Sequence, residues 1–125
     1  MSRHASGPVP DPWNAACPSR ALLALVGDKW ALLLLPVLAE GPKRNGELIR
    51  RLGGVSQKML TQTLRDLERN GLVRRRDYQE VPPRVDYALT PLGQSLGAVV
   101  GTLDRWVIDN FREVEKAQAA FDAAA

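Results

Sequence analysis

The sequence has few of the side chains on which enzymes and disulfide-stabilised proteins depend. It contains one cysteine, Cys17, and one histidine, His4, which lies in a proline-rich N-terminal segment. A single cysteine excludes a disulfide within the chain and is typical of a reducing compartment. The sequence has no phosphate-cradling glycine motif and no metal-ligand spacing. We therefore expect a protein that is not an enzyme and uses no metal and no cofactor.

Long apolar runs are missing as well. A membrane-spanning helix needs about 20 consecutive apolar residues, and the nearest candidate, residues 22–38, is interrupted by Gly27, Asp28 and Lys29. The N-terminus lacks the continuous apolar stretch of a secretion signal. With 125 residues, of which 45% are hydrophobic, the chain can bury one core. The expectation is a cytoplasmic protein without a membrane partner.

Positive charge is abundant, and it is concentrated in one part of the chain. Residues 43–84 contain 11 Lys and Arg against 5 Asp and Glu, a local charge of +6. The remaining residues sum to −3, which gives the net charge of +3. A localised basic surplus is the electrostatic footprint expected of a nucleic-acid-binding surface. The alternative, a module that binds only proteins, would not need this concentration of charge.

Residues 56–70 predict a well-capped amphipathic helix. Ser56 is a favoured N-cap, and Asn70-Gly71-Leu72 is typical of a helix C-terminus with a left-handed glycine. A basic outer face is most often only a solvated surface. Here the polar side chains are of the types that bind bases and phosphates, which favours a DNA recognition helix. The apolar face contains Leu60, Leu64 and Leu67, and the opposite face contains Lys58, Thr61, Gln62, Arg65 and Arg69.

The remaining elements follow from caps and periodicity. Helices are predicted over residues 18–27 and 29–39, and a third helix is predicted from an Asn45 cap through Leu52. Pro36 is expected to kink the 29–39 helix or to end its regular part early. Residues 72–78 and 84–89 read as two strands, with Val85, Tyr87 and Leu89 on one face, joined by a stiff connector. The last helix is expected to begin at Thr90-Pro91 and to run to about residue 116, with a frayed Ala-rich end.

This order of elements predicts a winged helix-turn-helix, a mainly α fold with a small β-hairpin wing (α+β). We expect a flexible arm over residues 1–16, a DNA-binding domain over 17–90 and a dimerisation helix over 91–125. The apolar stripe of that helix is longer than a compact core needs, so its distal part is expected to form a dimer interface. A ridge of Gly93, Gly97 and Gly101 would allow another helix to approach closely. The expected interface residues are Leu96, Val99, Val100, Leu103, Trp106, Val107, Phe111 and Val114.

Three motifs resemble those of the HxlR-type bacterial transcriptional regulators, a branch of the MarR-like winged-helix proteins. They are Cys17-Pro18 with GDKW at residues 27–30, GVSQKMLT at residues 54–61 with LRDLE at 64–68, and VPPRVDYALT at residues 81–90. The resemblance covers about residues 17–106. It implies a cytoplasmic homodimer that binds pseudo-palindromic operator DNA, often as a repressor. Asn45, where the family usually has an aromatic residue, and Pro36, in a helix that is usually uninterrupted, depart from its pattern.

The DNA contacts expected from this layout come from the recognition helix, the wing and helix N-termini. The first half of the 56–70 helix is expected in the major groove of double-stranded DNA, and Arg84, beside the Pro-Pro tip, in the minor groove. Arg74 and Arg76 share one strand face and Arg75 lies on the other. The expected DNA-binding residues are Lys43, Arg44, Ser56, Gln57, Lys58, Thr61, Gln62, Arg65, Arg74, Arg76 and Arg84.

Cys17 is the expected sensor. It immediately precedes Pro18, so it occupies the N-cap of the first helix, where the pKa of a thiol is lowered. The resemblance implies a cysteine that senses oxidants or electrophiles such as quinones; the alternative is an inert core residue. With one cysteine, the chemistry is limited to a bridge between two subunits, a mixed disulfide or alkylation. Another alternative is a small apolar effector, bound near Trp30 and Trp106, with no redox role for Cys17.

Overall fold

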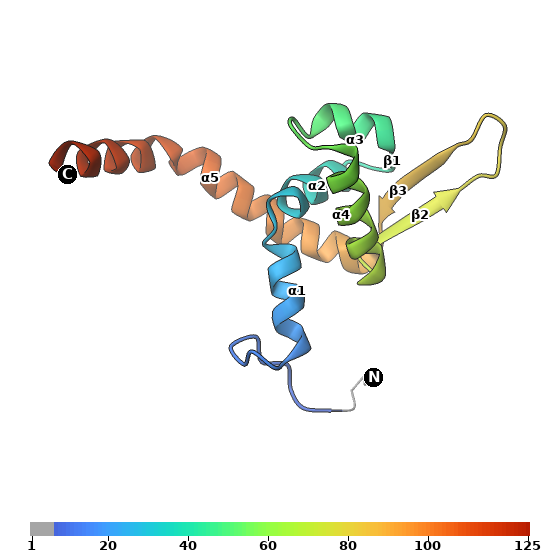
Figure 1. The fold of residues 1–125 in the computed structure, drawn as a ribbon, viewed down its shortest axis with the longest axis horizontal. Helices are drawn as coiled ribbons and strands as arrows, with labels where there is room; N and C mark the ends of the chain where they lie inside the picture. The colour runs from blue at the N-terminus through green and yellow to red at the C-terminus, as the bar shows by residue number, and fades with distance from the viewer. Residues whose placement is uncertain (1–6) are drawn as a thin grey trace.

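The computed structural model describes residues 7–125, which form five helices and a small sheet (Figure 1). The first part of the expected arm, with His4, lies outside the described residues. The elements are α1 (Pro18–Val26), α2 (Lys29–Ala39), β1 (Lys43–Arg44), α3 (Asn45–Arg51), α4 (Gln57–Arg69), β2 (Val73–Asp77), β3 (Val85–Leu89) and α5 (Pro91–Ala124). This is the predicted mainly α fold with a small wing.

Leucine side chains form the core, and α2 lies at its centre. Helix α2 packs against α4, α5 and β3, and its Leu34 and Leu35 have no exposed surface. Burial of each such side chain stabilises the fold by about 1.5–3 kcal/mol. Helix α4 contributes Leu60, Leu64 and Leu67 from the predicted apolar face. The buried side of α4 therefore fixes which of its side chains point outward.

Pro36 does not end α2, which continues to Ala39. A proline in a helix removes one backbone hydrogen bond. Val37 and Leu38, which follow Pro36, are both buried in the core, and their burial keeps the last turn helical in spite of that loss. The predicted extent of this helix, residues 29–39, is confirmed, and of the two expected effects of Pro36 an early end is wrong.

The wing contains three strands rather than the predicted two. Its order is β1-β3-β2, and all pairs are antiparallel. Lys43 pairs with Tyr87 and Arg44 pairs with Asp86, so β3 is the central strand. Because neighbours cover both of its edges, Asp86 and Ala88 are buried as well as Leu89, and the simple alternation expected for β3 is lost. A two-residue strand such as β1 has no periodicity that a sequence pattern could reveal.

Helix α4 is capped as predicted at both ends. The Ser56 side chain accepts a hydrogen bond from the Met59 N–H at 3.1 Å. At the other end, the Gly71 N–H donates to the Glu68 carbonyl at 3.0 Å and the Leu72 N–H to the Leu67 carbonyl at 2.9 Å. Gly71 has a φ of +74°, so this is a Schellman motif that needs its glycine.

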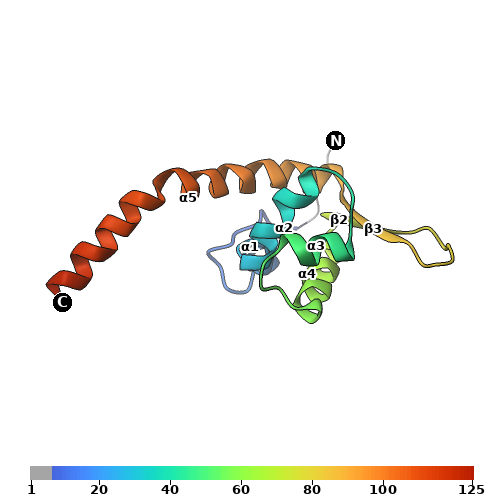
Figure 2. The ribbon, with the colours of Figure 1, turned by 90° about the horizontal axis from the view of Figure 1, so that it is seen from above.

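Two predicted helix boundaries are wrong. The N-cap of α3 is Arg44, whose N–H donates to the Glu47 side chain at 3.0 Å, and Asn45 is the first helical residue. Helix α5 continues to Ala124 instead of fraying near residue 116. Alanine has the highest helix propensity, so the Ala-rich end extends the helix to about 50 Å. Its distal half projects away from the other elements (Figure 2).

Helix α1 also stands out from the core. None of its residues is buried, and it makes an angle of 70° with α2. Asp28 caps α2 as predicted, accepting hydrogen bonds from the N–H groups of Trp30 and Ala31. Across residues 7–125, a membrane-length apolar stretch appears only when α1 and α2 are counted together, across this bend. Before α1, residues 11–17 form hydrogen-bonded turns, and Trp13 is 88% exposed.

Thr90 ties the ends of four elements together. Its hydroxyl accepts a hydrogen bond from the Gly93 N–H at 3.0 Å and donates one to the Gly71 carbonyl at 2.6 Å. Its N–H donates to the Leu72 carbonyl at 3.1 Å. A side chain at Gly93 would collide with that same carbonyl. The end of α4, the start of β2, the end of β3 and the start of α5 therefore meet at one point.

The predicted glycine ridge on α5 packs mainly within its own subunit. Gly93 faces Leu72, and a Cβ on Gly97 would lie 3.3 Å from Leu89 and 3.9 Å from Ala39. A Cβ on Gly101 would meet nothing within 4 Å among the described residues. The close approach that the ridge allows is therefore made at Gly93, to Leu72, and at Gly97, to β3 and α2.

Gly93→Ala should lower the free energy of unfolding by about 1–3 kcal/mol, because the new methyl group overpacks the Thr90 junction. Gly101→Ala is the matched control, and should raise that free energy by up to about 1 kcal/mol through helix propensity. Urea unfolding at one fixed protein concentration measures both. Equal effects of the two substitutions would contradict the close packing at Gly93.

Candidate nucleic-acid interface

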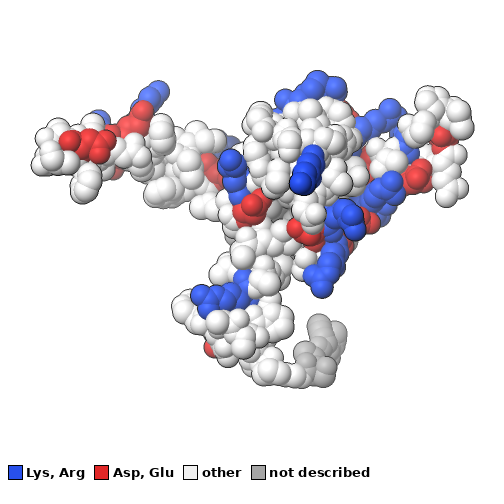
Figure 3. All heavy atoms as spheres, viewed as in Figure 1, with Lys and Arg blue, Asp and Glu red and all other residues white. Residues whose placement is uncertain are grey.

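Basic and polar side chains cover the outward face of α4. Lys58, Thr61, Arg65 and Arg69 are exposed, because the leucines on the other side of the helix hold that side against the core. Figure 3 shows Lys and Arg side chains gathered over α3, α4 and the β2–β3 ribbon on one side of the molecule. The structure thus brings the predicted recognition helix and wing to a common surface.

Hydrogen bonds along α4 orient two of its glutamines. The Gln57 side-chain amide donates to the Thr61 hydroxyl at 2.9 Å, and the Gln62 amide donates to the Asp66 carboxylate at 3.0 Å. Both pairs are four residues apart, the spacing at which side chains meet on a helix. Gln62 also lines a shallow groove with Asp28 beside α1, so it lies on the flank of the basic face.

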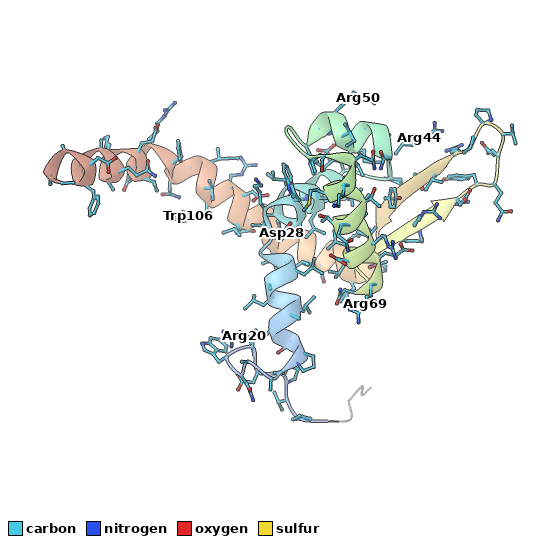
Figure 4. The ribbon with its side chains drawn as sticks, viewed as in Figure 1. Arg20, Asp28, Arg44, Arg50, Arg69 and Trp106 are labelled. Atoms are coloured by element: carbon cyan, nitrogen blue, oxygen red, sulfur yellow. The ribbon has the colours of Figure 1, made fainter. Side chains whose placement is uncertain are left out.

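Arg44, Arg50 and Arg69 mark the extent of the basic surface in Figure 4. Arg44 lies where β1 meets α3, Arg50 lies on α3 and Arg69 lies at the C-terminal end of α4, while Arg20 lies apart on α1. Arg50 is exposed and is not among the contacts predicted from the sequence. Its place on the basic side of the molecule becomes visible only in the folded structure.

Lys43 does not join this surface. Its ammonium group lies 3.7 Å from a Glu40 carboxylate oxygen and donates to the Gly41 carbonyl at 3.3 Å, and its side chain is only 13% exposed. Arg51 binds the same carboxylate through two hydrogen bonds of 2.8 and 2.7 Å, which holds the pKa of Glu40 below its usual value. The prediction of Lys43 as a DNA contact is corrected, because β1 turns its side chain away from Arg44.

The strand register determines which wing arginines share a face. Arg74 pairs with Ala88 and Arg76 with Asp86, whereas Arg75 pairs with Tyr87. Directly paired residues point to the same side of a sheet. The predicted division of Arg74 and Arg76 from Arg75 is therefore confirmed. Arg44 also pairs with Asp86, so it lies on the same face as Arg74 and Arg76.

Arg84 packs on an aromatic ring that the sequence did not single out. Its guanidinium lies 4.1 Å from the centroid of the Tyr78 ring, and that of Arg76 lies 4.6 Å from it. The Tyr78 hydroxyl donates to Asp86 at 2.8 Å. The sequence does not indicate the contacts of Tyr78 and Asp86, because these contacts form across two strands that are separated in sequence by the connector.

The expected dimer stripe on α5 divides into two parts. Val100 is 1% exposed and belongs to the core of its own subunit, which corrects its prediction as an interface residue, and Leu96 packs against that core. The remaining residues of the stripe face away from that core and are more exposed. The apolar residues of this distal stripe include Val99, Leu103, Trp106, Val107, Ile108 and Phe111, each between 46% and 68% exposed, with Val114 half-buried. Ile108 was not predicted.

The two tryptophans named as candidate effector contacts lie in different surroundings. Trp30 packs against the core, whereas Trp106 is 57% exposed on the projecting part of α5 (Figure 4). A separate apolar groove of about 430 Å³ lies between α1 and α5 and is lined by neither. Leu22, Leu72 and Val99 are among its lining residues.

Cys17 is the N-cap of α1, as predicted. Its sulfur accepts a hydrogen bond from the Asp11 N–H at 3.4 Å and lies 3.1 Å from the Ser19 hydroxyl. These donors stabilise the thiolate, the Asp11 N–H most, and so lower the pKa of the Cys17 thiol. The thiol is half-buried and has no second cysteine to pair with in its own chain.

A three-helix core with a recognition helix and a β-ribbon defines a winged helix-turn-helix protein, a class that binds DNA rather than catalysing a reaction. Residues 25–115 match the model of the HxlR-like helix-turn-helix family. The chain belongs to this family and is a helix-turn-helix transcriptional regulator.

Individual relatives agree with this assignment. The HTH-type transcriptional regulator YtfH of Escherichia coli is 46% identical over 98 residues, which are 78% of each chain. The solved structure of the transcriptional regulator YtfH from Salmonella typhimurium has a TM-score of 0.85 and 39% identity, covering 89% of this chain and 99% of that one. The reduced form of the redox regulator HypR has a TM-score of 0.72 and 36% identity, covering 79% and 98%.

Proposed function

We propose that the chain binds a pseudo-palindromic operator in double-stranded DNA as a homodimer and represses transcription there, in the cytoplasm. The observation that carries this proposal is the exposed basic face of α4, which lies on the same side of the molecule as the basic side chains of α3 and the β2–β3 ribbon. A module that binds only proteins would have no use for a field of this sign and concentration. Membership of the family establishes the role as a transcriptional regulator. The proposal adds that the DNA target is pseudo-palindromic and is bound by a dimer.

In the proposed complex, the N-terminal half of α4 enters the major groove. Side chains that can reach bases or phosphates there are Gln57, Lys58, Thr61, Gln62 and Arg65. Arg44 and Ser56 lie at helix N-termini, where phosphate is favoured. Arg74, Arg76 and Arg84 of the wing contact the backbone or the adjacent minor groove.

The second subunit covers the distal stripe of α5. This stripe exposes Leu103, Trp106 and Phe111 on one helix, and contiguous exposed apolar residues commonly mark an interaction surface. The groove between α1 and α5 continues it, so both terminal helices contribute to the proposed interface. A two-fold dimer would hold two recognition helices about one DNA turn apart.

Modification of Cys17 is the proposed control. The support is the pair of hydrogen-bond donors around its sulfur and the similarity to a protein named as a redox regulator. An oxidant such as diamide would take two electrons and two protons from two Cys17 thiols, which leaves a disulfide between subunits and a reduced hydrazine. Pro18, next to Cys17, lines a groove with Asp66 and Arg69 of α4, so a bridge between subunits at Cys17 would form close to the C-terminal end of the recognition helix.

Lys58→Ala combined with Arg65→Ala should abolish specific binding to a duplex that the parent protein selects from a randomised library. These two exposed cations lie at the centre of the α4 face, and neither packs in the core. Parent binding should weaken steeply with salt, since each neutralised phosphate adds about −0.9 to the log–log slope. Electrophoretic mobility shifts at several salt concentrations measure both quantities.

Arg112→Ala combined with Lys116→Ala removes the same charge from the distal part of α5 and should leave specific binding intact. Circular dichroism and sedimentation equilibrium should show the same fold and subunit number for both double variants. Unchanged affinity of the α4 variant, or a flat salt response of the parent, would rule out this binding mode.

Cys17→Ser should bind the same duplex as the parent and fail to release it when diamide or a quinone is added, because the only thiol is gone. Fluorescence anisotropy of labelled duplex follows the release, and non-reducing electrophoresis detects the disulfide between subunits. If the variant is released as readily as the parent, thiol control is excluded and a non-covalent apolar effector becomes the better hypothesis.

A further inference from the structure

Four side chains form a compact block on one face of the wing. Arg76 pairs with Asp86, and the Tyr78 N–H donates to the Arg84 carbonyl at 2.9 Å across the two strands. Since side chains alternate along a strand, residues 76, 78, 84 and 86 all point to the same side of the ribbon. This block of Arg76, Tyr78, Arg84 and Asp86 lies next to Arg44, which pairs with Asp86 from β1.

The Tyr78 ring contacts two like charges. Both guanidiniums lie over it, at 4.1 Å for Arg84 and 4.6 Å for Arg76, where the ring attracts cations. Within residues 7–125 the buried Nε of Arg84 has no hydrogen-bond partner, so stacking rather than hydrogen bonding sets the orientation of this guanidinium. A stacked guanidinium keeps its N–H edge free for a phosphate oxygen.

Asp86 anchors the ring to the sheet. It is only 9% exposed and accepts the Tyr78 hydroxyl hydrogen at 2.8 Å. The short bond to a carboxylate and the backbone bond to Arg84 hold the ring at two points. The block therefore places two cations at fixed positions on a strand surface, where long arginine side chains would otherwise sample many rotamers.

We propose that Tyr78 is a positioning residue for DNA binding: its ring holds Arg76 and Arg84 in the orientation in which both meet the phosphate backbone along the minor groove next to the recognition helix. This inference rests on the proposed function, since it concerns the same DNA-binding surface. Tyr78 itself touches no base. Because the ring already orders the two arginine side chains, they lose less conformational entropy when they bind DNA.

The test is a cycle of variants on the full chain: Tyr78→Leu, Tyr78→Phe, Arg76→Ala with Arg84→Ala, and the triple variant that adds Tyr78→Leu to the two arginine changes. The probe is the duplex that the parent selects from a randomised library, with binding measured between roughly 50 and 200 mM salt. Tyr78→Leu should weaken binding roughly tenfold and make the salt slope less steep. Tyr78→Phe keeps the ring and should bind within about threefold of the parent.

The triple variant separates positioning from a folding role. If Tyr78 acts through the two arginines, Tyr78→Leu has no further effect once they are alanine. Equal weakening in both backgrounds, or a Tyr78→Leu variant that binds like the parent with its full salt slope, overturns this inference and leaves the proposed function standing. A parent that selects no duplex overturns both. Urea unfolding verifies that each variant compared is folded.

Discussion

The Thr90 hydroxyl, bound to the Gly71 carbonyl and to the Gly93 N–H, is the contact on which the arrangement of this molecule depends. It joins Gly71, which follows the C-cap of the recognition helix, to the first turn of α5, and β2 begins and β3 ends at the same point. The three parts that bind DNA and a second subunit in our proposal therefore share one rigid junction. A change in α5 would be transmitted to α4 and the wing without a flexible linker between them.

Charge and apolar surface are separated along the chain around that junction. The leucine core directs the basic face of α4 outward, and the sheet register directs four wing-side arginines, Arg44, Arg74, Arg76 and Arg84, to one face. Most exposed apolar side chains lie instead on α1 and along α5, while α4 exposes Met59 and the tip of the wing exposes Val81. A basic surface suits DNA and an apolar stripe suits a second copy, so the two proposed partners would not compete for one site.

The features that were predictable from sequence are those that local interactions determine. The caps of α4, its two faces and the N-cap position of Cys17 depend on neighbouring residues, and each is found where it was expected. Features that depend on tertiary packing were missed. The sequence suggests that Lys43 is free to bind DNA and Val100 to bind a second subunit, but Lys43 pairs with Glu40 and Val100 is buried in the core. The strand β1 and the Tyr78 block form only through strand pairing. The length of α5 was missed for another reason, because its Ala-rich end was treated as frayed although alanine favours helix.

The most direct test of two-fold DNA binding is a hydroxyl-radical footprint of the full chain on the selected duplex. Two protected patches should lie on one side of the duplex, centred about one helical turn apart, where the two recognition helices enter successive major grooves. Weaker protection should flank each patch, where the wings reach the minor groove. A single patch without two-fold symmetry, or protection spread evenly along the duplex, would contradict the account.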